Sequence, residues 1–406
     1  MKRISVLLVL VVLTLSVSAL SQGKFSGYMF GDYYYNIGRD SSFGLPSTIH
    51  KAPGASAANG SVPGPKAMQA FQIRRIYFAY DNDISEQFTT RFRLEADQAA
   101  TPGVTAPVAT VTGTVDTTKR PPTVSGSSAA PGLDELVGGK VSVFVKDAYL
   151  TWKNIFPGSN LTFGIQPTAA FDISETAYGY RFIEKTIMDL RGIVPSRDLG
   201  ISLKGKLVGD GMANYWVMIA NSSGNAPESD KYKRYSANIQ VKPITNFQAT
   251  LYVDLKDAAD ITVTGSAKSN STMIEALFLN YSVPFMYNFG VETFMSSQSN
   301  AFLATGATEP KSLSALGYSV WGSYNLMPEL TAFLRYDSYD PNTDSDTKAK
   351  GDSRNLILAG LSWKADKNVS ISPNIYYETY ETPAAAGSAS IDPSLSARLT
   401  LYYIFL

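Results

Sequence analysis

The segment 88–97, FTTRFRLEAD, contains the pattern that decides the fold. Its residues fall into an apolar set and a polar set that alternate along the chain: Phe88, Phe92, Leu94 and Ala96 against Thr89, Arg91, Arg93, Glu95 and Asp97. Successive side chains of a β-strand point to opposite faces. A strand with charge on one face only lies between water and an apolar phase, which is either lipid or a protein core.

The same period of two recurs along the whole chain, for example in 247–256, 369–378 and 395–405. About sixteen segments follow it, each near the ~9–11 residues that a tilted membrane strand needs. They centre on 24–37, 69–80, 86–98, 142–153, 160–166, 196–206, 212–220, 232–242, 247–256, 272–283, 286–296, 313–324, 329–337, 353–364, 369–379 and 395–406. Arg74 and Arg75 are adjacent, so we expect one of them to face outward or to lie near a rim.

The connections between these segments alternate between short and long. The short ones are 82–86, 154–159, 208–211, 243–246, 283–285, 325–328 and 365–368. The long ones are 38–68, 99–140, 167–195, 221–231, 257–271, 297–312, 338–352 and 379–394. Outer-membrane barrels have short periplasmic turns and longer external loops. A soluble sandwich has no reason to alternate in this way, so the pattern predicts an all-β antiparallel up-and-down transmembrane barrel.

The N-terminus has the pattern of a secretory signal peptide. Lys2 and Arg3 precede an apolar run at 4–17, and Ala19 and Ser21 stand at positions −3 and −1 of a cleavage site. We therefore predict a cleavable signal peptide at 1–21 and an outer-membrane barrel at 22–406; an uncleaved anchor is the alternative. The chain has no Cys and so no disulfide, which fits export into a bacterial envelope.

The composition after residue 21 narrows the choice of structure. No later apolar run is long enough for a helix to cross a bilayer, and lipid tolerates only helices and closed barrels as spanning structures. Without Lys2 and Arg3 the chain has 33 basic and 35 acidic residues, a net charge near −2. Such a balance indicates no nucleic-acid partner.

Catalytic motifs are missing from the sequence. The one histidine, His50, lies in a Gly/Pro/Ala-rich stretch, where preorganisation for catalysis is poor. There is no G-x-S-x-G, P-loop, HExxH or Cys/His metal spacing. We expect no enzyme activity, no cofactor and no metal site.

Several segments together resemble the phosphate-selective porin O/P family of Gram-negative bacteria. They are FQIRRIYFAYDNDI at 71–84, FTTRFRLEAD at 88–97, KDAYLTWK at 146–153, LTFGIQP at 161–167, FIEK at 182–185, SRDLGISLKGKL at 196–207, LRYDSYDPN at 334–342 and LYYIF at 401–405. The resemblance implies a sixteen-stranded barrel, a homotrimer and a third external loop folded into the lumen. The chain end resembles the signal read by barrel-assembly machinery, although that signal usually ends in an aromatic residue and Phe405 here is penultimate.

The polar faces of the predicted strands supply candidate pore-lining residues. These are Arg74, Arg91, Arg93, Glu95, Asp97, Asp147, Lys153, Asp198, Lys204 and Arg398. The third external loop would be 167–195, in which 182–190 can form a short helix with Ile183, Ile187 and Leu190 on one side. Arg181, Glu184, Lys185 and Asp189 would then line a constriction; the alternative is that they only solvate the loop.

These features predict an outer-membrane porin for passive diffusion of small polar solutes or anions, in contact with the lipid bilayer and lipopolysaccharide. The family often has lysines after the LTFG segment, whereas this chain has Ile165-Gln166-Pro167. With mixed charge in the lumen, phosphate specificity is not supported. Two alternatives stay open: a secreted soluble β-sandwich that binds sugars, and a closed outer-membrane barrel such as an adhesin or a transporter of hydrophobic solutes.

Overall fold

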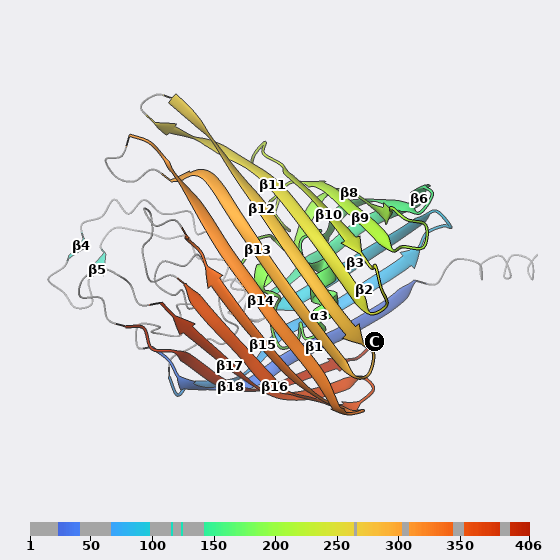
Figure 1. Ribbon diagram of the computed structural model, residues 1–406, viewed down its shortest axis with the longest axis vertical. Coiled ribbons are helices and arrows are strands. Elements are labelled where there is room, and N and C mark those ends of the chain that lie inside the picture. Colours follow the sequence, from blue (N-terminus) through green and yellow to red (C-terminus); the bar gives the residue numbers. More distant parts are fainter. Residues whose placement is uncertain are drawn as a thin grey trace, which may run out of the picture.

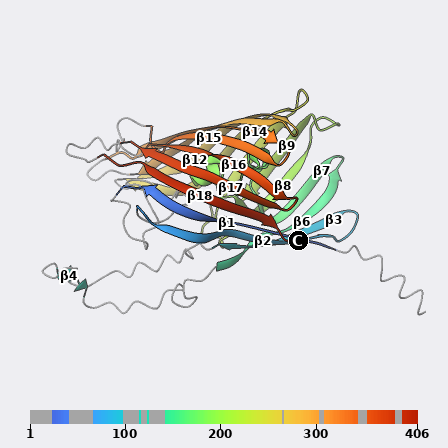
Figure 2. The ribbon, with the colours of Figure 1, turned by 90° about the horizontal axis from the view of Figure 1, so that it is seen from below.

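In the computed structural model, sixteen strands of the described residues form one closed antiparallel barrel (Figures 1 and 2). The structure describes residues 23–40, 66–97, 115–116, 123–124, 142–263, 266–302, 308–343, 353–381 and 390–406. The predicted signal peptide at 1–21, His50 and most of the predicted loops 38–68 and 99–140 lie outside these residues. The prediction of an up-and-down barrel with about sixteen strands is confirmed.

The barrel strands follow one another around the ring in chain order. They are β1 (Lys24–Gly38), β2 (Gln69–Asp83), β3 (Phe88–Asp97), β6 (Ser142–Phe156), β7 (Ser159–Pro167), β8 (Arg197–Lys206), β9 (Ala213–Ala220), β10 (Arg234–Val241), β11 (Phe247–Val263), β12 (Ser266–Val283), β13 (Tyr287–Phe302), β14 (Lys311–Met327), β15 (Leu330–Asp340), β16 (Arg354–Asp366), β17 (Val369–Tyr380) and β18 (Ser394–Ile404). A separate two-stranded sheet pairs β4 (Val115–Asp116) with β5 (Thr123–Val124). The ring closes because β1 pairs with β18, with Tyr33 opposite Leu399. Closure leaves no sheet edge with unpaired backbone groups.

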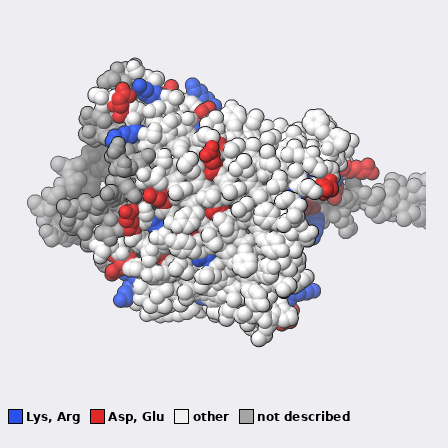
Figure 3. Space-filling model, in the orientation of Figure 1, with Lys and Arg blue, Asp and Glu red and all other residues white. Residues whose placement is uncertain are grey.

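The barrel wall is apolar on its outer face and polar on its inner face, the reverse of the arrangement in a soluble protein. On β11, Leu251 is 56% exposed on the outside, whereas Tyr252 and Asp254 on the inside are each 2% exposed. Figure 3 shows an outer face that is mostly uncharged, with most charged side chains toward its margins. Glu275 on β12 is an exposed exception. An apolar exterior around a polar interior is the arrangement of a transmembrane barrel.

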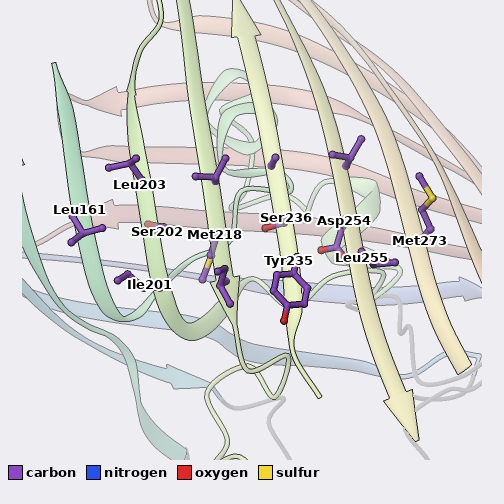
Figure 4. A pocket seen from close by; sticks show the side chains of 14 residues that line it. Leu161, Ile201, Ser202, Leu203, Met218, Tyr235, Ser236, Asp254, Leu255 and Met273 are labelled. Atoms are coloured by element: carbon purple, nitrogen blue, oxygen red, sulfur yellow. The ribbon is translucent and has the colours of Figure 1, made fainter. Parts of the chain in front are cut away.

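The outer face of β7 to β12 is hollowed into an apolar groove of about 580 Å³ (Figure 4). Leu203, Tyr235 and Met273 are among the side chains that line it. Exposed aromatic side chains also follow the end of the barrel with the short connections: Trp152, Tyr281, Phe285, Phe289, Tyr324, Trp363 and Phe405. Aromatic belts of this kind occur at membrane–water interfaces.

The connections depart from the prediction at one end of the barrel. Residues 257–263 and 266–271 belong to β11 and β12, not to a loop, and pair with each other, for example Asp257 with Ser271. Residues 297–302 likewise extend β13. These extensions have polar residues on both faces, so they lack the alternation that identified the other strands. The paired hairpin satisfies its own backbone groups beyond the apolar outer band.

Two short helices, α3 (Asp172–Tyr178) and α4 (Ile187–Leu190), lie between β7 and β8. Neither helix of the described residues is long and apolar enough to cross a membrane. They belong to the segment 168–196, which we call the inner segment because of the contacts described next.

Candidate functional site

The inner segment contacts strands from widely separated parts of the ring. Its backbone carbonyl groups accept hydrogen bonds from Arg74 of β2 (2.8 Å), Asn238 of β10 (2.8 Å), Asn288 of β13 (2.6 Å) and Arg335 of β15 (2.5 Å). A segment of the chain can reach all of these strands only from within the ring. The barrel interior is therefore partly filled by 168–196.

Apolar side chains attach the inner segment to the wall from β9 round to β1, where Tyr34 lies in the cluster of Leu190. Ile187 and Met188 are fully buried in a cluster with Trp216, Tyr252 and Phe294. Further clusters join Leu190 to the strand residues Leu356, Leu358 and Tyr376, and Tyr178 to Phe278 and Trp321. Full burial of one such side chain contributes about 1.5–3 kcal/mol. The clusters together hold the segment firmly against this side of the barrel.

Ion pairs on the same side are almost completely shielded from solvent. Arg191 Nη1 lies 2.8 Å from Glu378 Oε1, and the side chains are 0% and 4% exposed. Two further pairs are similarly covered: Arg335 with Asp337 at 2.5 Å, and the predicted site residues Arg398 and Glu184 at 3.7 Å. We call these three the buried pairs. The pairs of Arg191 and Glu184 join the inner segment to β17 and β18, and Arg335 of the β15 pair donates to the carbonyl group of Lys185.

The predicted helix at 182–190 is wrong in extent. Only Ile187–Leu190 is helical, although Ile183, Ile187 and Leu190 are all buried, as the pattern indicated. The preceding carbonyl groups have other partners: Arg74 binds those of Phe182 and Ile183, and Arg335 binds that of Lys185. A continuous helix would need these carbonyl groups for its own hydrogen bonds.

A β-bulge on β2 brings two adjacent arginines into the interior. Phe30 of β1 pairs with Arg75, and the next residue, Gly31, pairs with Ile73, so Arg74 is the extra residue. A Cβ on Gly31 would lie 2.4 Å from the carbonyl oxygen of Gln72, so the bulge requires glycine opposite it. The expectation that one of the two arginines faces outward or lies near a rim is wrong, because both point to the inner face within β2. The bulge resets the alternation, and Arg74 reaches Asp32 (2.7 Å) while Arg75 reaches Glu95 (2.6 Å).

A second bulge lies on β6. Arg93 of β3 pairs with Asp147, and the next residue, Leu94, pairs with Val145, which leaves Lys146 as the extra residue. Lys146 Nζ lies 2.9 Å from Glu95 Oε2. Asp147 forms two ion pairs: Oδ2 lies 2.7 Å from Arg93 Nη2, and Oδ1 lies 2.5 Å from Nε of Arg197 in β8. The two bulges thus place consecutive charged residues of β2 and β6 on the inner face.

The resulting network has its cations toward solvent and its acids behind them. The cations are Arg75, Arg93, Lys146 and Arg197, with side chains 11–15% exposed; we call them the cation wall. The two acids, Glu95 and Asp147, are only 2% and 1% exposed. Two carboxylates therefore balance part of the charge, but the more exposed side chains of the network are the basic ones.

The inner segment presents its own charges near this side. Arg181 pairs with Glu175 at 2.9 Å and with Asp189 at 3.5 Å, and Lys185 lies 3.6 Å from Asp189. Lys185 is 30% and Arg181 22% exposed, against 9% for Asp189. Burial alone would raise the pKa of Asp189, but Lys185 and Arg181 outweigh it and hold this pKa below its usual range.

The remaining predicted residues are spread over the barrel. Near the short connections, Arg91 pairs with Asp81 and Lys153 with Asp83, both at 3.2 Å and about a third or more exposed. Lys204 lies over the ring of Trp216 at 4.3 Å. Asp198 is buried and accepts hydrogen bonds from the backbone N–H groups of Leu199 and Ser222. Only the backbone of Asp97 is described, paired with Ser142 at the end of β3.

Three residues of the cation wall were not among the sequence candidates: Arg75, Lys146 and Arg197. Strict alternation assigns only one of two neighbouring residues to the inner face. The prediction from alternation therefore missed one inner-face residue at each bulge. A signal was present, because two consecutive charged residues in an otherwise alternating strand, as in Arg74-Arg75 and Lys146-Asp147, are best accommodated by a bulge. Arg197 lies at the start of β8, where the alternation was not yet established.

No family model matches this sequence, and no curated protein is significantly similar to it. Solved structures with similar folds include an anion-selective porin from Comamonas acidovorans (11% identity, TM-score 0.56, covering 95% of this chain and 100% of the porin). The outer membrane channel DcaP of Acinetobacter baumannii is also similar (13% identity, TM-score 0.57, 95% and 98% covered). So is OmpT, an outer membrane protein of Vibrio cholerae, in its trimer form (10% identity, TM-score 0.54, 95% and 100% covered). At these identities the likeness establishes the porin-type barrel fold.

Proposed function

We propose that this protein is an outer-membrane porin through which small polar solutes, preferentially anions, diffuse passively. The observation that carries the proposal is the cation wall, because its four basic side chains face solvent while their acidic partners lie behind them. The inner segment adds the exposed cations Arg181 and Lys185 and the exposed Glu175, so these three side chains carry one net positive charge. Rings of charged side chains of one sign select for the opposite ion.

The inner segment is the third external loop of this porin and forms its constriction. The buried pairs and apolar clusters fix it to the wall from β9 round to β1. The aqueous path then runs between the segment and the wall from β2 to β8. Charge across this path both orients a solute and excludes apolar molecules.

We further propose export by the signal peptide at 1–21, insertion by barrel-assembly machinery, and a homotrimer in contact with lipopolysaccharide in a Gram-negative outer membrane. The apolar exterior and the aromatic belt support the membrane location. The similar fold of OmpT in its trimer form supports the oligomer. Membership of the O/P family rests on the sequence resemblance. We do not extend it to phosphate specificity, because Glu95 and Asp147 already neutralise part of the wall.

The alternatives fit the molecule less well. A soluble β-sandwich has two packed sheets with an apolar core between them, whereas this sheet closes on itself and exposes its apolar face. A transporter of hydrophobic solutes needs an apolar path. Here the exposed side chains between the inner segment and β2 to β8 are charged.

Reconstitution into planar bilayers tests the proposal. The purified protein should give discrete ion-conducting steps in KCl, in groups of three if the trimer forms, and a KCl gradient should give a reversal potential of the sign for chloride preference. Insertion without ionic current would overturn the porin function. Current with cation preference would overturn the assigned role of the cation wall alone.

A further inference from the structure

A row of uncharged amide side chains crosses five adjacent strands on the inner face near the short connections. Asn214 of β9 donates to Gln240 of β10 (3.2 Å), Gln240 to Gln248 of β11 (2.8 Å), Gln248 to Asn280 of β12 (3.1 Å) and Asn280 to Asn288 of β13 (2.7 Å). Asn288 in turn donates to the carbonyl oxygen of Ala177 in α3 (2.6 Å). We call this row the amide ladder.

The amide ladder lies on the interior side of the wall. Its members alternate with exposed apolar residues such as Ile239 (49% exposed) and share the face of buried residues such as Trp216 and Phe278. A cavity of about 480 Å³ opens over it between the connections 207–212 and 242–246, and Gln248 and Asn280 are among its lining residues. Gln248 and Asn280 of the ladder can therefore be reached from this cavity at the end of the barrel with the short connections.

Two members of the ladder retain hydrogen-bonding capacity. A carboxamide has two N–H donors and an oxygen with two lone pairs. In the described part of the chain, the hydrogen bonds of the Gln240 and Gln248 side chains each use one N–H and one oxygen lone pair within the ladder. Each amide can therefore still donate to and accept from a solute.

The chemistry of this surface differs from that of the cation wall. A hydroxyl group both donates and accepts, so a chain of hydroxyls can match a row in which donors and acceptors alternate. A carboxylate only accepts and gains nothing from the amide oxygens. Neighbouring strands are about 4.8 Å apart. The amides on successive strands can therefore form hydrogen bonds with successive hydroxyl groups of a polyhydroxylated chain.

We propose that the amide ladder is a transit site for hydroxyl-rich organic anions, such as sugar acids. The inference rests on the proposed porin function: the solute passes the inner segment along the cation wall, and its hydroxyl groups then bind at the ladder, which lies on β9 to β13 but nearer the short connections than the buried pairs. The site adds a preference for hydroxylated over plain carboxylates, which the charge of the pore alone does not provide.

Block of the chloride current in planar bilayers tests this with two four-carbon anions, threonate, which has three hydroxyl groups, and butyrate, which has none. Threonate should halve the current at a lower concentration than butyrate. Gln248→Leu and Gln240→Leu should each raise the half-blocking concentration of threonate by about fivefold, the effect of one net hydrogen bond, and leave that of butyrate unchanged.

Gln298→Leu is the matched control. Gln298 of β13 is also an inner-face amide bonded across to β12, donating to Asn270 at 3.0 Å, but at the opposite end of the strands. Its substitution should leave threonate block unchanged. Equal block by threonate and butyrate, or no effect of both ladder substitutions, would overturn the amide ladder as a site while leaving the porin function intact. A wild-type protein that conducts no chloride would overturn the porin function and this inference with it.

Discussion

The interior of the barrel has ion pairs on two sides, and they differ in their access to water. The buried pairs, such as Arg191 with Glu378, are at most 4% exposed and lie among apolar clusters. The cations of the cation wall have comparable partners at comparable distances but remain 11–15% exposed. Pairing of charge alone therefore does not identify a pore lining. We propose that solutes pass the inner segment on the side where the cations are exposed to water, and that the dry side holds the constriction in place.

The largest effect is expected from breaking a buried pair. Glu378→Ala leaves the Arg191 guanidinium buried without its carboxylate, which costs about 3–5 kcal/mol. The free energy of unfolding in detergent, measured by urea titration, should fall by that amount, and the conductance should become noisy as the inner segment loses its attachment.

Asp83→Ala is the matched control for this loss. Asp83 pairs with Lys153 at 3.2 Å near the short connections, but it is 63% exposed. Exposed pairs contribute at most about 1 kcal/mol, so this variant should be close to the wild type. Equal losses of stability in Glu378→Ala and Asp83→Ala would remove the distinction between the two sides.

A smaller effect is expected from reversing one charge of the cation wall. Arg93→Glu leaves Asp147 paired with Arg197, so the fold should persist while the local potential becomes more negative. At about 8 Å a change of two charges is worth roughly 1 kcal/mol for each monovalent ion in water. At low salt this lowers the chloride permeability about fivefold and raises the potassium permeability by about the same factor. Reversal potentials in a KCl gradient measure it. Lys367→Glu, in an exposed short connection, is the control and should leave the chloride-to-potassium permeability ratio unchanged. An unchanged permeability ratio in Arg93→Glu would show that solutes do not pass this wall.

The smallest effect concerns pH and Asp189. Since its pKa in the folded protein lies below that of the unfolded chain, its contribution to holding Lys185 and Arg181 is present at neutral pH and is lost only as pH falls through the lowered value. The part of the conductance and selectivity that depends on Asp189 should stay constant from pH 7 to about 4, near the ordinary aspartate pKa, and change below it. Asp189→Asn should show the acid behaviour already at pH 7. A transition of the wild type at pH 5–6 that is absent from Asp189→Asn would contradict this account.

The sequence was sufficient to predict the barrel, because a period of two depends only on local alternation between the apolar exterior and the polar interior. It failed where that alternation is locally reset. The extra residues Arg74 and Lys146 bring their neighbours to the inner face. The strand extensions 257–263 and 266–271 have polar residues on both faces and so lack the alternation. The buried face of Ile183, Ile187 and Leu190 was predicted from spacing. The part of the barrel wall that this face contacts could not be predicted, because ion pairs such as that of Arg191 with Glu378 join residues far apart in the chain.

The central claim, that solutes pass along the cation wall and not along the dry side, can be tested by thiol accessibility, because the 406-residue chain contains no cysteine. Oγ of Ser196 lies 3.1 Å from Nζ of Lys146 in the cation wall. Ser319 on β14 is only 1% exposed. A negatively charged, membrane-impermeant thiol reagent applied to open channels should modify Ser196→Cys and reduce its current, and should leave Ser319→Cys unaffected. Modification of Ser319→Cys as fast as that of Ser196→Cys would contradict the account.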